Sequence, residues 1–181
     1  QHQIVKIMKY PLSSRILHWL MALIIIFLLG LGIYMADFLQ ADSPNRMEVY
    51  SLHKSLGVMV LILVAIRLIN RAIFPAPALP DSLPKIEKIG AHLAHIALYL
   101  LMILIPISGY LMSNAFGYPV HFFSVEMPFL IQKNLELAPL FAELHEIFAY
   151  SLIAVLGLHI LGVIKHRFFD TAENDVLKRM L

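Results

Sequence analysis

The run LHEIFAYSLIAVLGLH, residues 144–159, decides how this chain folds. It is apolar except near its ends, where His145 and His159 stand 14 residues apart. At about 100° per residue an α-helix returns to nearly the same face over this interval, and it rises about 21 Å. The hydrocarbon core of a bilayer is about 30 Å thick. One membrane-spanning helix is therefore predicted to present two imidazoles on one face, at two depths.

The composition of the whole chain indicates an integral membrane protein. Of its 181 residues, 60% are hydrophobic and 14% are charged, whereas soluble domains have about 25% charged residues. The absence of cysteine excludes disulfides, cysteine-held iron–sulfur clusters and covalently attached c-type haem. The chain also has nine histidines. Ionisable groups are costly inside a membrane and tend to be functional there, so the histidines are the first candidates for a site.

Four apolar segments are long enough to cross a membrane. The predicted helices cover about residues 16–38, 52–74, 89–112 and 144–168. The first is predicted to be an uncleaved anchor, because no convincing small-residue cleavage site follows it. A long loop, 113–143, is expected to lie against the membrane surface. The predicted fold class is all-α, with residues 1–181 forming one domain, an up-and-down bundle of four transmembrane helices.

The basic residues predict the orientation of this bundle, because Lys and Arg collect in cytoplasmic loops. Eleven of the 14 basic residues lie on the side of the two termini: Lys6, Lys9, Arg15, Arg67, Arg71, Lys85, Lys88, Lys165, Arg167, Lys178 and Arg179. The opposite side holds Arg46, Lys54 and Lys133. We therefore expect both termini in the cytoplasm.

This topology places the histidines at two depths. His53 and His145 start their helices near the outer face, whereas His18 and His159 lie near the cytoplasmic face. Each pair can supply two axial nitrogens to one non-covalent b-type haem, and two neutral imidazoles suit electron transfer rather than oxygen binding. A lone histidine at a helix end is more often an interfacial residue than a ligand. Four histidines that pair by depth favour ligation of two haems.

Other polar and small residues fit this arrangement. Arg67 is 14 residues from His53, so it is expected at the depth of the inner pair, where a haem propionate can neutralise it. His92 and His95 are weaker candidates near the cytoplasmic end of the third helix. A flat macrocycle needs small residues beside it, but small residues also let membrane helices approach one another. The glycines in question are Gly30, Gly32, Gly57, Gly109, Gly157 and Gly162.

Several motifs, in order along the chain, resemble the bacterial cytochrome b561 family of small di-haem membrane cytochromes. They are ILHW (16–19), LHKSLG (52–57), HLAH (92–95), ISGY (107–110), LHE (144–146) and GLH (157–159). The resemblance covers nearly the whole chain. It implies two b-type haems, exchange of electrons with ubiquinone or another quinone, and residence in the bacterial inner membrane. The same helical core resembles the b subunits of nickel–iron hydrogenases and formate dehydrogenases.

The resemblance leads to a functional hypothesis. An outer donor, superoxide or a redox protein, reduces the His53/His145 haem, and the electron reaches quinone through the His18/His159 haem. The candidates for propionate and quinone contacts are Arg67, Arg71, His95, Lys85 and His166. One type of family member oxidises superoxide, which would make this chain an oxidoreductase. However, the outer side carries seven acidic and three basic residues, a poor match for an anionic substrate.

Two alternatives belong to other functional classes. One is a haem-bearing membrane anchor that relays electrons for a soluble partner dehydrogenase. The other is a bundle that binds or transports a metal without haem. Membrane lipid and quinone are expected partners, and nucleic acid is not. His2 and His121 are interpreted as surface residues.

Overall fold

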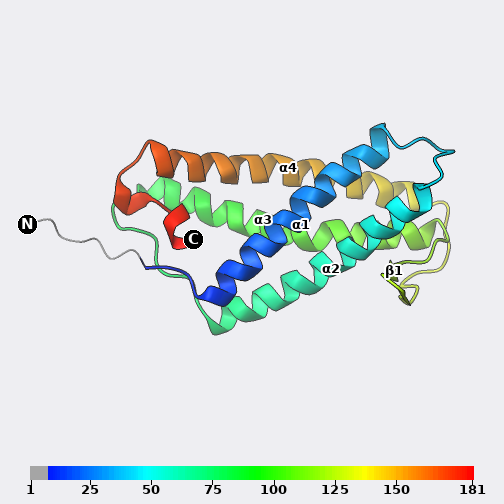
Figure 1. The fold of residues 1–181 in the computed structure, drawn as a ribbon, viewed down its shortest axis with the longest axis horizontal. Helices are drawn as coiled ribbons and strands as arrows, with labels where there is room; N and C mark the ends of the chain where they lie inside the picture. Colours follow the sequence, from blue (N-terminus) through cyan, green and yellow to red (C-terminus); the bar gives the residue numbers. More distant parts are fainter. Residues whose placement is uncertain (1–7) are drawn as a thin grey trace, which may run out of the picture.

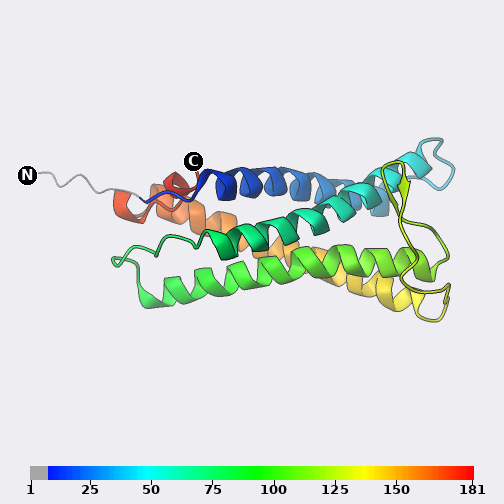
Figure 2. The ribbon, with the colours of Figure 1, turned by 90° about the horizontal axis from the view of Figure 1, so that it is seen from below.

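Four long helices make up most of the computed structural model, which describes residues 8–181. They are α1 (Leu12–Asp37), α2 (Arg46–Ile73), α3 (Lys85–Ala115) and α4 (Ala138–Phe168). All four are long and apolar enough to cross a membrane, and consecutive helices run in opposite directions (Figures 1 and 2). The predicted all-α transmembrane class is confirmed. His2 and Lys6 lie outside the described residues.

The helices start four to six residues before the predicted apolar runs. Proline explains several of these starts: α1 and α3 follow Pro11 and Pro84 directly, and α4 has Pro139 in its first turn. Proline fits at the start of a helix because the first amide hydrogens of a helix have no acceptor within it, so the lack of one costs nothing. Hydropathy marks the part of each helix that suits lipid, whereas the helix itself continues into the more polar interface.

The helices pack as two pairs. α1 packs on α2, α3 packs most extensively on α4, and the contact of α2 with α3 joins the pairs. Within the described chain, α4 makes no comparably close backbone contact with α1 or α2. A small core of Met21, Val64 and Met102 connects α1, α2 and α3.

The two ends of the bundle differ. One end carries the start of α1, the α2–α3 connection and the C-terminal segment, with the short helices η1 (Ala172–Asn174) and η2 (Leu177–Arg179) (Figures 1 and 2). The other end carries the α1–α2 loop and an antiparallel hairpin of β1 (His121–Phe122) and β2 (Val125–Glu126). We call these the terminal end and the hairpin end.

The hairpin is fastened to α2 by one serine. Ser55 Oγ donates a hydrogen bond to the carbonyl oxygen of His121 (3.0 Å) and accepts one from the backbone N–H of Phe123 (2.9 Å). Phe123 has a φ of 54°, a value that non-glycine residues adopt mainly in tight turns. The long loop therefore closes over the bundle next to His53.

Candidate functional site: two levels of histidines

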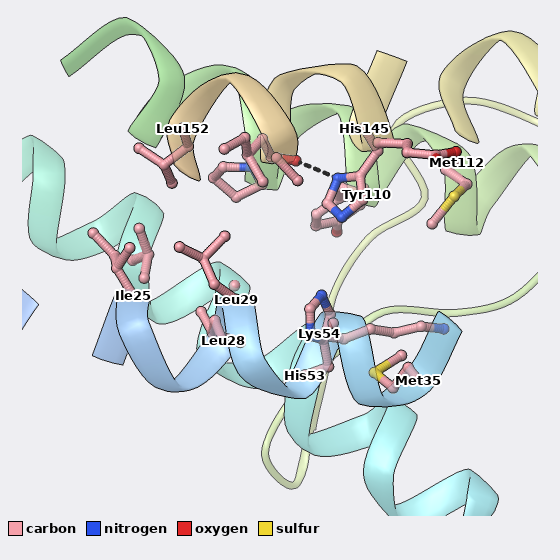
Figure 3. Close-up of a pocket in the computed structure, with 18 of the residues that line it drawn as sticks. Ile25, Leu28, Leu29, Met35, His53, Lys54, Tyr110, Met112, His145 and Leu152 are labelled. Atoms are coloured by element: carbon pink, nitrogen blue, oxygen red, sulfur yellow. Dashed lines mark hydrogen bonds between the residues drawn. The ribbon is translucent and has the colours of Figure 1, made fainter. Parts of the chain in front are cut away.

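A cavity of about 400 Å³ lies between the two helix pairs at the hairpin end. His53 from α2 and His145 from α4 face each other across it (Figure 3). Their ring centres are 6.2 Å apart and their planes are 77° apart. Most of the cavity wall is apolar, and its charged members are Lys54 and Glu146. A pocket of this size and character suits a largely apolar cofactor with few polar contacts.

The imidazole of His145 is held in one tautomer. Its Nδ1 lies 2.9 Å from the carbonyl oxygen of Ile105 on α3, the hydrogen bond drawn in Figure 3. A carbonyl oxygen only accepts, so Nδ1 carries the hydrogen and Nε2 keeps its lone pair. Metal-binding histidines are commonly held in this way. Nε2 of His145 is therefore prepared to act as a ligand.

Glycine at position 109 allows the imidazole of His145 to lie against α3. A Cβ added at Gly109 would lie 2.9 Å from Cε1 of His145, whereas one at Gly32 would make only an ordinary contact, 3.7 Å, with Cε1 of His53. Among the described residues, Nδ1 of His53 is buried and has no hydrogen-bond partner. An unpaired buried nitrogen is costly, which is a reason to expect a further group beside it.

A second level of histidines lies toward the terminal end. The ring centres of His18 (α1) and His159 (α4) are 6.4 Å apart, with planes at 59°. His95 from α3 is also close, with its ring centre 5.6 Å from that of His159. The structure thus brings together the two histidines that the sequence pairs by depth, and it adds a third.

Arg67 lies at the same level, as its spacing from His53 predicts. Its Nη2 is 3.0 Å from Nδ1 of His18, and its Nε donates to the hydroxyl of Tyr99 at 3.1 Å. A guanidinium has only donors, so Nδ1 of His18 accepts. Tyr99 was not singled out from the sequence. Its position four residues after His95, on the same helix face, is the signal that could have identified it.

The remaining candidates have other neighbours. The guanidinium of Arg71 lies over the ring of Tyr10, 5.8 Å from its centre, and Lys85 is exposed in the first turn of α3. His166 lies between two carboxylates: Nδ1 is 2.8 Å from Asp170 Oδ2, and Nε2 is 3.5 Å from Glu87 Oε2. Sequence reasoning did not find Glu87, because only the packing of α3 on α4 brings it to His166. It also missed Asp170, although the spacing of four residues from His166 is a signal that could have identified it.

Comparison with known proteins agrees with this architecture. The family model described as "Prokaryotic cytochrome b561" matches residues 9–181. The chain belongs to the prokaryotic cytochrome b561 family. The resemblance drawn from the sequence motifs is thereby confirmed.

Curated relatives match this cytochrome over most of their length. Cytochrome b561 homolog 2 of Escherichia coli (strain K12) is 33% identical over 174 residues, which cover 96% of this chain and 91% of the relative. The probable superoxide oxidase CybB of Yersinia pestis is 29% identical, with 96% of each chain covered. Cytochrome b561 homolog 1 of Escherichia coli (strain K12) is 24% identical, with 95% and 97% covered.

Membership of the family has several consequences. This cytochrome is a membrane protein of electron transport, and the family implies a b-type haem as its cofactor. Four membrane-spanning helices in a prokaryotic family indicate a multi-pass protein of the inner membrane.

Proposed function

We propose that this cytochrome binds two b-type haems and transfers electrons across the membrane, from a donor at the hairpin end to a quinone at the terminal end. The observation that carries the proposal is the presence of two histidine pairs at two levels of the bundle. Helix α4 contributes one histidine to each pair. Bound haem would supply one-electron oxidation and reduction at each level. The chain's own residues would hold the haems and the substrates.

The spacing of the rings fits bis-histidine ligation. The ring centres are 6.2 Å apart in the first pair and 6.4 Å apart in the second. Histidine nitrogens bind metals at about 2.0 Å, so each pair leaves room for one iron between its two rings. His53 and His145 would hold the outer haem, in the cavity of about 400 Å³, and His18 and His159 the inner one.

Arg67 and His18 must rearrange for the inner site to form. In a neutral ring whose Nδ1 accepts from Arg67, the hydrogen is on Nε2, so Nε2 cannot bind a metal. Ligation through Nε2 requires the hydrogen bond between Arg67 and His18 to break. The guanidinium then has the charge and the free donors to bind a haem propionate. We assign Arg67 and Arg71 to propionate contacts, and Lys85, His95 and His166 to the neighbourhood of the quinone.

The orientation follows from the distribution of basic residues, most of which lie at the terminal end. With both termini in the cytoplasm, the hairpin end faces outward and the donor reacts there. Lys54 is the cationic residue of the outer cavity wall. Its Nζ donates to the carbonyl oxygen of Pro119 at 3.2 Å and lies 5.7 Å from the centre of the Tyr118 ring.

Two kinds of donor fit different observations. Lys54 beside His53, and the similarity to the probable superoxide oxidase CybB of Yersinia pestis, support superoxide. In that reaction two superoxide anions, one quinone and two protons give two dioxygen molecules and one quinol. The acidic balance of the outer side supports a cationic redox protein instead. In both cases quinone is the acceptor.

The test uses protein purified in detergent. We expect a b-type spectrum with two haems per chain, loss of the outer haem alone in His145→Ala, and loss of the inner haem alone in His159→Ala. Stopped-flow reduction of the oxidised haems by superoxide, with and without added ubiquinone, then distinguishes the donors. A colourless protein, or loss of both haems from either folded variant, would contradict the proposal.

A further inference from the structure

The imidazole of His166 lies outside both histidine levels. It follows His159 by seven residues, about 10 Å along α4, and lies at the terminal end. The side chains of His166, Asp170 and Glu87 are 13%, 18% and 27% exposed, so the group is sheltered but reaches the surface. Each ring nitrogen faces a carboxylate from a different part of the fold.

The arrangement suits proton exchange better than one metal ion. The three residues could offer ligand atoms within 4.8 Å of one another. However, the two carboxylates face different nitrogens of the ring, and a single ion binds only one nitrogen of an imidazole. Lys165 also forms an ion pair with Glu87 Oε1, which places a positive charge where a second cation would have to bind.

Asp170 fixes the orientation of the ring. Its carboxylate accepts hydrogen bonds from the side chain of Asn174 (2.9 Å) and from the backbone N–H of Thr171 (2.7 Å). With the contact to His166, these hydrogen bonds lower the pKa of Asp170 from 3.8 to about 2. Asp170 therefore remains ionised at neutral pH and accepts the hydrogen of His166 Nδ1. The nitrogen left to gain and lose a proton is Nε2.

Glu87 is the natural proton partner of Nε2. Its Oε2 lies 3.5 Å from Nε2 and, among the described residues, is buried without a hydrogen-bond partner. The ionisable groups around His166 are then Glu87 from α3, Lys165 from its own helix and Asp170 from the C-terminal segment. Glu87 is eight residues before His95, about 12 Å along α3, and thus lies between the surface and the inner histidines.

We propose that His166 and Glu87 carry protons between the cytoplasmic solvent and a quinone at the terminal end, with Asp170 as a positioning residue. This inference rests on the proposed quinone reduction. One quinone takes two electrons, which arrive from the outer donor, and two protons, and becomes quinol. Each proton moves from solvent to His166 Nε2, then to Glu87 Oε2, and from there toward the quinone oxygen. Positioned proton donors contribute large factors to such steps.

The test compares His166→Gln and Glu87→Gln with the wild-type haem-loaded protein. Haem content and spectrum should be unchanged, whereas steady-state ubiquinone reduction should fall at least about tenfold at neutral pH. Added imidazole should restore a His166→Ala variant and should not restore Glu87→Gln. Glu173→Gln is the matched control: Glu173 is an exposed carboxylate three residues from Asp170, and its removal should leave the rate unchanged.

A second readout does not depend on turnover. Infrared difference spectra of the resting protein, recorded between acid and neutral pH, should show a protonatable carboxyl that disappears in Glu87→Gln and shifts in His166→Gln. Wild-type rates in both variants, or no such carboxyl band, would overturn the relay. If the wild type takes up electrons but never reduces quinone, the proposed function is wrong, and the relay has no quinone to supply with protons. The infrared result then still decides whether Glu87 and His166 exchange a proton.

Discussion

Gly109 on α3 and His145 on α4 are in direct contact: a Cβ at Gly109 would approach Cε1 of the imidazole to 2.9 Å and Nδ1 to 3.0 Å. The carbonyl oxygen of Ile105, one turn before Gly109 on the same helix, lies 2.9 Å from Nδ1 of this ring. The imidazole therefore cannot move aside without losing its hydrogen bond. The proposed outer haem site depends on the absence of a side chain at position 109.

Gly109→Ala should therefore lower occupancy of the outer haem. Overpacking of this kind costs about 1–3 kcal/mol, and the displaced ring loses the alignment of Nε2. Haem content per chain, measured on the purified protein, should fall toward one. Gly90→Ala on the same helix is the control, because nothing lies within 4 Å of a Cβ there and alanine favours helix. Full haem content in Gly109→Ala would show that the site tolerates a shifted His145.

Both His18 and His95 lie close enough to His159 to be the second ligand of the proposed inner haem. The ring centre of His159 is 6.4 Å from that of His18 and 5.6 Å from that of His95, and the longer separation leaves more room for an iron between the rings. We expect His18→Ala to lose the inner haem and His95→Ala to keep both haems, with a slower reaction with quinone. Haem quantification and low-temperature spectra measure this. If His95→Ala removes the inner haem and His18→Ala does not, His95 is the ligand.

Arg67→Gln should lower the reduction potential of the inner haem. Removal of a cation near the iron makes the oxidised form relatively more stable, by on the order of 1 kcal/mol, or roughly 50 mV for one electron. A redox titration in detergent measures it. Arg67→Lys should retain most of the wild-type potential, and Arg71→Gln, whose guanidinium lies over Tyr10, should have a smaller effect. An unchanged inner potential in Arg67→Gln would remove Arg67 from the propionate site.

The sequence was sufficient to predict the features that depend on one helix at a time. The spacing of His145 and His159 predicts two levels on one face of α4, and apolar length predicts the four helices. Features that depend on how helices are rotated against each other could not be predicted. His95 joins the inner level, and Glu87 reaches His166, only because α3 packs on α4 in one particular register. The hairpin bound by Ser55 has strands of two residues each, which are too short to show an alternating pattern of apolar and polar residues in the sequence.

Because of Asp170, the stability of the terminal end should depend on pH in the acidic range. Its pKa is lowered to about 2, chiefly by the Asn174 side chain and then by His166 and the Thr171 amide. The ionised carboxylate therefore stabilises the fold above its ordinary pKa of 3.8, and this contribution is lost as the pH falls toward 2. Wild-type protein should melt at a higher temperature than Asp170→Asn at pH 6, and most of the difference should be lost as the pH falls to 2. A difference that is undiminished at pH 2 would show that Asp170 acts by packing rather than by charge.

Arg179 ties the two termini to the α2–α3 connection. It is 4% exposed, and its guanidinium donates to the carbonyl oxygens of Met8 (3.3 Å), Pro77 (2.9 Å) and Ala78 (2.8 Å). It also lies 5.7 Å from the centre of the Tyr10 ring. Arg179→Ala leaves these carbonyl groups without their donor, and hydrogen bonds to a charged group are worth about 1.5–3 kcal/mol each.

We therefore expect Arg179→Ala to destabilise the terminal end by about 2–4 kcal/mol and to speed proteolysis within residues 75–84. Because Trp19 donates to the carbonyl oxygen of Met180 (2.9 Å), the same variant should weaken this hydrogen bond and change the fluorescence of the indole. Lys178→Ala, which removes a neighbouring partly exposed charge, should change stability by less than about 1 kcal/mol. The outer haem, at the far end of the bundle, should keep its spectrum in both variants, so loss of that spectrum in Arg179→Ala would mean that the bundle unfolds as one unit.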